Sequence, residues 1–125
     1  MDIEQRKYPR FSVQNHTFAA LGSEFEIVGK VNDISIKGLN VSYLSESIKN
    51  SSDRDFSQVC IFLSKGSFDL PKVPCKIVYD NKDPKSINNS SIMIRRCGFH
   101  FGKLSKSQSE LLELFIENYA TEPLS

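Results

Sequence analysis

The sequence has no tryptophan, and its 125 residues include only three cysteines and two histidines. Cys60, Cys75 and Cys97 are odd in number and lie far apart in apolar runs, with no Cys-x-x-Cys pair and no adjoining histidine. This pattern argues against a disulfide framework and against a zinc-type ligand set. We therefore expect reduced thiols packed in the core and no metal site.

The two histidines, His16 and His100, stand outside any catalytic motif. The sequence contains no nucleophile elbow, no phosphate-cradling glycine-rich loop and no helical His-Glu pair around them. We expect both to be strand residues that face core or solvent. The protein is therefore predicted not to be an enzyme.

The sequence also lacks an excess of charge and a long apolar run. Sixteen basic residues oppose fifteen acidic ones, so the net charge of +1 provides no general attraction for nucleic acid or an anionic membrane. No apolar run approaches the roughly twenty residues of a membrane span, and residues 1–6 have no signal-peptide core. These absences predict a cytoplasmic protein with no nucleic-acid partner and no membrane insertion, in which any anion site is local.

Hydrophobic alternation, interrupted by turn-forming residues, predicts six short antiparallel strands. Gly29 is a candidate bulge, and Pro71 and Pro74 indicate an edge or a bend. Residues 45–57 and 80–91 are predicted to be long connections, the first with a short helical turn near its start. The expected strands are residues 16–21, 24–32, 39–44, 59–63, 68–79 and 92–101.

A helix is predicted after the last strand. Capping boxes are available at Ser107–Glu110 and, in competition, at Ser105–Gln108. The helical period separates an apolar face from a face of glutamates. The apolar face carries Leu111, Leu112, Phe115, Ile116 and Tyr119, and the opposite face Glu110, Glu113 and Glu117.

These elements favour an all-β domain: a six-stranded antiparallel β-barrel, closed or nearly closed, with the C-terminal helix covering an open end. Nine phenylalanines and four tyrosines supply the bulk of the core. Residues 1–14 are polar and interrupted by Pro9, so we expect them to form a flexible N-terminal arm without regular structure. Residues 15–125 then form the barrel with its helix.

Asp33, Ser35 and Gly38 lie at fixed offsets between two of the predicted strands. An aspartate accepts two donors at once, a serine offers a short hydroxyl, and a glycine lets the backbone approach a bound group. These properties suit a polar, planar ligand. The alternative is a plain turn, in which Asp33 and Ser35 bond to nearby backbone amides and Gly38 supplies positive φ.

A second cluster upstream contains Arg6 and Arg10, four positions apart. With Asp33-x-Ser35-x-x-Gly38, this Arg-x-x-x-Arg motif resembles the PilZ domain family. Gly98-Phe99-His100-Phe101, followed by a short polar turn and a helix, is similar to the family's last strand. The resemblance covers about residues 5–119 and implies the same split β-barrel with a C-terminal helix.

The PilZ resemblance implies a ligand, the bacterial second messenger cyclic di-GMP, and no cofactor. An arginine can pair with a phosphate, fork onto guanine O6 and N7 or stack on the base, which suits Arg6 and Arg10. Asp33 is then matched to guanine N1 and N2, Ser35 to a phosphate or base contact, and Gly38 to close approach of the ligand.

Four further residues are possible auxiliary contacts. In the family the residue before the first arginine influences whether one or two ligand molecules bind; here it is Gln5, with Lys7 after Arg6, and both stoichiometries stay open. Arg95 and Arg96 could add contacts near the start of the last strand. Charged pairs entering an edge strand more often face solvent.

The first functional hypothesis is a bacterial receptor and adaptor. Ligand binding would order the arm over the barrel and create a surface for an unidentified protein effector in motility, biofilm formation or secretion. The second hypothesis is a protein-interaction module of the same fold that acts without nucleotide. A barrel that binds single-stranded nucleic acid would need a basic groove, and the near-neutral charge disfavours it.

Overall fold

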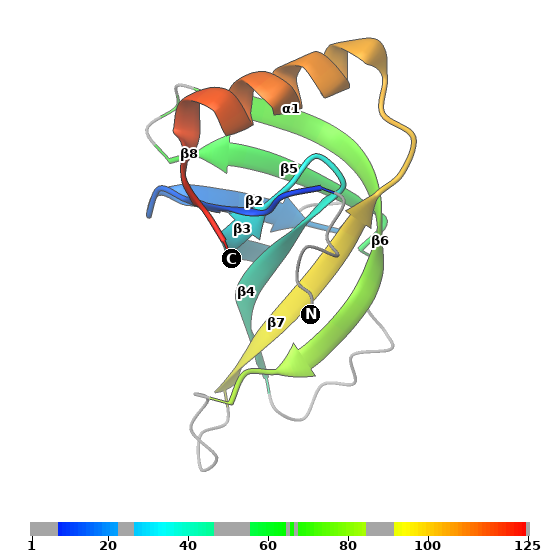
Figure 1. Cartoon of the computed structure of the whole chain (residues 1–125). Coiled ribbons are helices and arrows are strands. Elements are labelled where there is room, and N and C mark those ends of the chain that lie inside the picture. The colour runs from blue at the N-terminus through cyan, green and yellow to red at the C-terminus, as the bar shows by residue number, and fades with distance from the viewer. Residues whose placement is uncertain are drawn as a thin grey trace.

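The computed structural model describes residues 8–22, 27–46, 56–64, 66, 68–84 and 92–124. The described residues form eight strands, which join in one connected sheet, and one helix (Figure 1). The elements are β1 Phe11–Val13, β2 Thr17–Leu21, β3 Ile27–Ile34, β4 Gly38–Glu46, β5 Gln58–Leu63, β6 Asp69–Lys82, β7 Ile92–Phe101, α1 Lys106–Tyr119 and β8 Ala120–Pro123.

Six of the strands close into an antiparallel barrel, as predicted. Their order is β2-β5-β6-β7-β4-β3, and β3 pairs back with β2. Closure leaves these six strands without an open edge at which another chain could pair. The core inside is built from alternate residues of each strand, with Phe99 and Phe115 among its largest buried side chains.

Two further strands, β1 and β8, were not expected. β1 pairs with the motif end of β3 through Phe11↔Ile34 and Ser12↔Asp33, and β8 pairs with β1. The prediction that residues 1–14 contain no regular element is therefore wrong for β1. Three residues are too few for a hydrophobic period to show, and β1 is held by hydrogen bonds to distant parts of the chain. Residues 1–7 of the predicted arm lie outside the described residues.

The long strands β4 and β6 extend further than their sequences suggested. β4 continues to Glu46, so the short helical turn expected from Ser45 does not begin there. β6 runs on to Lys82, which places Asp80 in the sheet opposite Cys97 rather than in an exposed loop. Near Pro71 and Pro74 the β5–β6 register shifts and Lys72 has a φ of 53°, which confirms the predicted bend.

Helix α1 begins at the second of the two candidate caps. Ser105 is the N-cap: its Oγ accepts from the Gln108 N–H, and the Gln108 side chain accepts from the Ser105 N–H, both at 3.0 Å. Gln108 also donates to the carbonyl of Lys72 at 3.2 Å, which favours this cap over the one at Ser107 because it ties the helix to β6. Leu112 and Phe115 are buried against the barrel, as predicted.

All three cysteines are free thiols, and Cys75 and Cys97 are buried. Burial raises the pKa of Cys75 to about 12. Among the described residues, no three potential metal-ligating side chains gather in one place. The described part of the chain also has no helix with both the length and the apolar character to cross a membrane.

Candidate functional site

The site begins with a bulge that turns Asp33 outward. Val31 and Ile34 are both buried in the core, although they are three positions apart. The register of β3 against β4 shifts between Val31 and Asp33, so β3 has one extra residue there. Asn32 and Asp33 therefore both lie on the outer face of the barrel. The bulge is at this point and not at Gly29, which pairs in regular register with Ala19.

Asp33 and Arg10, one residue from each predicted motif, are in direct contact. The Nη1 atom of Arg10 donates to Oδ1 of Asp33 at 2.6 Å, and the two side chains are 26% and 13% exposed. Arg10 immediately precedes β1, and its carbonyl accepts from the Leu124 N–H at 2.8 Å. The strands β1 and β8 thus hold the arginine over the aspartate, at a distance at which a charge-assisted hydrogen bond is strong.

Ser35 and Gly38 shape the turn between β3 and β4. The Ser35 N–H donates to the Gly38 carbonyl at 2.8 Å, and the Lys37 N–H donates to Ser35 Oγ at 3.0 Å. The turn interpretation is thus right for Ser35, whose side chain is buried in the turn. It is wrong for Asp33, whose carboxylate bonds to Arg10.

Gly38 does not have the positive φ that the turn interpretation required. A Cβ at this position would collide with the carbonyl oxygen of Phe99 on β7. Glycine is therefore needed here for close approach of two strands. A contact of Gly38 with a ligand stays a prediction.

A row of polar side chains, which the sequence did not reveal, extends the site across the barrel. Nδ2 of Asn32 donates to Oδ1 of Asn40 and to Oγ of Ser42, both at 2.8 Å. Asn40 in turn donates to the hydroxyl of Tyr79. The Tyr79 ring lies over Gly98, where a Cβ would collide with it. Asparagine is a turn former in sequence, so only the alternation of Asn40 and Ser42 with buried residues could have indicated this row.

Two of the possible auxiliary contacts, Arg95 and Arg96, differ in exposure and in the partners that they bind. Arg95 is only 14% exposed, and its Nε lies 2.8 Å from Oδ1 of Asp80. Tyr43 donates to both oxygens of the same carboxylate, at 2.9 and 2.8 Å. Burial alone would lower the pKa of Arg95, but the hydrogen bond and charge of Asp80 raise it overall. Arg95 thus belongs to a structural ion pair, and the expectation that it faces solvent is wrong.

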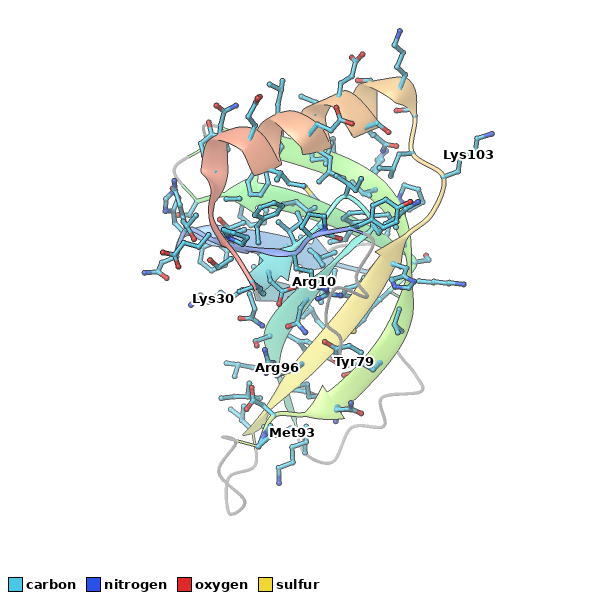
Figure 2. The ribbon with its side chains drawn as sticks, in the orientation of Figure 1. Arg10, Lys30, Tyr79, Met93, Arg96 and Lys103 are labelled. Atoms are coloured by element: carbon cyan, nitrogen blue, oxygen red, sulfur yellow. The ribbon has the colours of Figure 1, made fainter. Side chains whose placement is uncertain are left out.

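Arg96, in contrast, does face solvent. Its side chain is 44% exposed, with Nε 3.8 Å from Asp83 Oδ2. The strand is not an edge, because β7 pairs with both β4 and β6. The cross-strand pairs Lys30↔Ser42 and Ser42↔Arg96 place two cations on either side of the Ser42 hydroxyl. In Figure 2 Arg10, Tyr79 and Arg96 are labelled over the middle of the sheet and Lys30 to its left.

The outer face of β3, β4, β6 and β7, together with Arg10 before β1, thus combines cations, the Asp33 carboxylate, amides and an aromatic ring. Such a surface can hold a ligand that has phosphates and hydrogen-bonding bases. Gln5, Arg6 and Lys7 lie outside the described residues, so their predicted roles stay predictions.

Comparison with known proteins identifies the family. The PilZ domain profile matches residues 4–118, nearly the whole chain. The chain belongs to the PilZ domain family. The third motif of this PilZ domain now has a physical reason: Gly98 makes room for Tyr79, and the Phe101 N–H donates to the Lys37 carbonyl at 2.8 Å, which fastens the motif turn to β7.

Solved structures show the same PilZ fold. The chain resembles the PilZ domain of YcgR from Escherichia coli, described with c-di-GMP, at a TM-score of 0.62 and 16% identity, over 90% of each chain. It also resembles the E. coli YcgR structure in complex with c-di-GMP, at a TM-score of 0.58 and 15% identity, over 90% of this chain and 45% of that one. A search of the curated proteins finds no match.

Proposed function

We propose that this PilZ domain is a receptor for cyclic di-GMP, which it binds on the outer face of β3, β4 and β7. The observation that carries the proposal is the contact between Arg10 and Asp33, which joins the two motifs in one site. The YcgR structures to which the chain is similar are described with this ligand.

The proposed chemistry follows from the residue types. Asp33 accepts from N1 and N2 of a guanine, while Arg10 holds the carboxylate in place and donates to a phosphate or to guanine O6 and N7. Ser35, two positions after Asp33, is assigned a phosphate or base contact, and its Oγ also accepts from the Lys37 N–H. Arg96 of β7, opposite Ser42 of β4, adds a solvent-facing cation for the second phosphate. Arg95 is left out of the ligand set because Asp80 already binds it.

The proposed output is binding to a cytoplasmic protein effector, without catalysis. Ligand binding orders the residues before Tyr8, which include Arg6, across the site. The ordering step is assigned to these residues because Arg10, directly before β1, already contacts Asp33. The ordered segment then forms part of the surface that an effector in motility, biofilm formation or secretion recognises.

Titration calorimetry with cyclic di-GMP tests the proposal. Wild type should bind with micromolar or tighter affinity, and Arg10→Ala should lose most of that affinity. The matched control is Lys106→Ala, which removes an exposed cation at the start of α1, away from the site, and should bind as wild type does. Cyclic di-AMP should bind at least about tenfold more weakly, because adenine lacks the N1 and N2 donors for Asp33.

A flat titration of folded wild-type protein would reject the receptor and favour the module that acts without nucleotide. Equal affinities for wild type and Arg10→Ala would reject the site.

A further inference from the structure

The turn that joins β3 and β4 lies beneath helix α1 (Figure 1). A groove between this turn and the helix is lined by residues of both. It consists of two hollows of about 400 and 550 Å³, and Ile36 and Glu113 line both of them. The two hollows therefore adjoin each other along α1. The second hollow is also lined by Glu110, Leu114, Ile116 and Glu117.

The walls of this groove combine exposed apolar side chains with unpaired carboxylates. Ile36 is 41% exposed and Leu114 is 50% exposed, on opposite sides of the groove. Three exposed carboxylates on α1 line the second hollow: Glu110, Glu113 and Glu117. Within the described ranges, no ion pair involves any of the three. Lys37 and Lys103 line the first hollow, whereas the described residues that line the second include three glutamates and no lysine or arginine. The second hollow, with an apolar strip beside a row of carboxylates, is therefore complementary to a segment that is both basic and apolar.

The positions of these carboxylates also destabilise the helix. Glu113 and Glu117 are four positions apart, and like charges at this spacing repel. Glu117 lies near the C-terminal end of α1, where the helix dipole disfavours an anion, and no basic residue stands in the last turn. Cations from a partner would relieve both effects, and sequence choices that oppose local stability are typical of functional surfaces.

We propose that this groove docks a basic, amphipathic helical segment of a protein partner. Its apolar side chains pack between Ile36 and Leu114, and its lysines or arginines pair with Glu110, Glu113 and Glu117. A helix laid in a groove buries apolar area along one face while its flanking charges set orientation and specificity.

The groove is also linked to the motif, and this second step rests on the proposed function. Ile36 and Lys37 form the apex of the motif turn between Ser35 and Gly38. Lys37 Nζ lies 5.0 Å from the centre of the Tyr8 ring, and Tyr8 lines the groove two positions before Arg10. A ligand that contacts Arg10 and Ser35 therefore affects the positions of Tyr8 and of the motif turn, which both line this end of the groove. The affinity of the groove for its partner then changes when the ligand binds.

Fluorescence anisotropy with a labelled synthetic helix of leucines and lysines, about 18 residues long, tests the docking step. Wild type should bind this peptide, and Glu113→Gln/Glu117→Gln and Ile36→Ser should each weaken binding by about tenfold or more. The control Glu122→Gln removes an exposed carboxylate from β8 and should stay within about twofold of wild type. The double glutamine variant should melt at or above the wild-type temperature, which excludes misfolding as the cause.

Three results would overturn the docking step: equal affinity for all the variants, equal affinity for a peptide with glutamate in place of lysine, or a dimer of wild type that Glu113→Gln/Glu117→Gln abolishes. The last would assign the groove to a second copy of this chain.

Repeating the wild-type titration with saturating cyclic di-GMP tests the linkage. Peptide affinity should change by at least about threefold, and the change should vanish in Arg10→Ala. An unchanged peptide affinity with a ligand that calorimetry shows to bind would reject the linkage alone. Absence of ligand binding would reject the proposed function, and the docking step would then be decided by the peptide variants.

Discussion

Gly38 of β4 lies so close to the Phe99 carbonyl of β7 that a side chain cannot fit between the two strands. This contact gives the motif glycine a role in folding that does not depend on any ligand. We predict that Gly38→Ala lowers the free energy of unfolding by about 1–3 kcal/mol, because the strands must separate to admit a methyl group.

Urea unfolding measures this effect. Gly66→Ala is the control: a Cβ there meets nothing within 4 Å, although φ is +76°, so its cost should be limited to backbone strain of about 1 kcal/mol. Wild-type stability in Gly38→Ala would show that the strands move apart freely. It would then restore ligand approach as the main reason for glycine.

Asp33→Asn should affect binding more than folding. The amide keeps the size of the side chain but removes the charge and one acceptor, so cyclic di-GMP affinity should fall by on the order of 1–3 kcal/mol in calorimetry. The ion pair with Arg10 is partly exposed, so the free energy of unfolding should change by less than about 1 kcal/mol. A large loss of stability with unchanged affinity would make this ion pair structural only.

Asp80→Asn should have the opposite profile. The carboxylate accepts from Arg95 and Tyr43, and its removal leaves the Arg95 guanidinium largely buried without its counter-ion. We predict a loss of about 2–3 kcal/mol in urea unfolding.

For comparison, Arg96→Gln changes an exposed side chain and should stay within about 0.5 kcal/mol of wild type. Similar stabilities for Asp80→Asn and Arg96→Gln would contradict a structural role for the Arg95 ion pair.

Cys75 should make stability depend on alkaline pH. Burial raises the pKa of its thiol from 9.0 to about 12. The unfolded chain then releases this proton near pH 9, whereas the folded protein retains it. The contribution of Cys75 is therefore fully present below pH 9 and is lost as the pH rises toward 12.

Unfolding series between pH 8 and about pH 10.5 test this, and Cys75→Val should flatten the decline relative to wild type. Native Cys75 should also resist alkylation at pH 8 until the protein is unfolded. Parallel pH profiles in wild type and Cys75→Val would contradict the raised pKa.

Several elements of the fold could be predicted from the sequence because they carry strong local signals. The last of the six predicted strands, β7, was predicted with its observed bounds, since Ile92–Phe101 is bounded by polar segments on both sides. The helix was recognised from its apolar face, but the choice between two caps depended on a tertiary contact of Gln108 with β6. Asp80 was misassigned to a loop because Asp and Asn read as turn formers, whereas pairing with β7 extends the strand.

For the site, sequence alone selected Arg10 and Asp33, which the structure brings into contact, and Ser35, because their residue types and spacing carry the family motifs. Their contacts with a ligand stay predictions. Sequence could not show that the bulge at Asn32 turns Asp33 outward, since the bulge depends on the register of β3 against β4. It also could not show that β1 and β8 hold Arg10 against Asp33, since those strands pair residues more than a hundred positions apart. The Asn32–Asn40–Tyr79 row and the groove beside α1 likewise exist only after barrel closure. Local chemistry specified the functional groups; long-range strand pairing decided which of them meet.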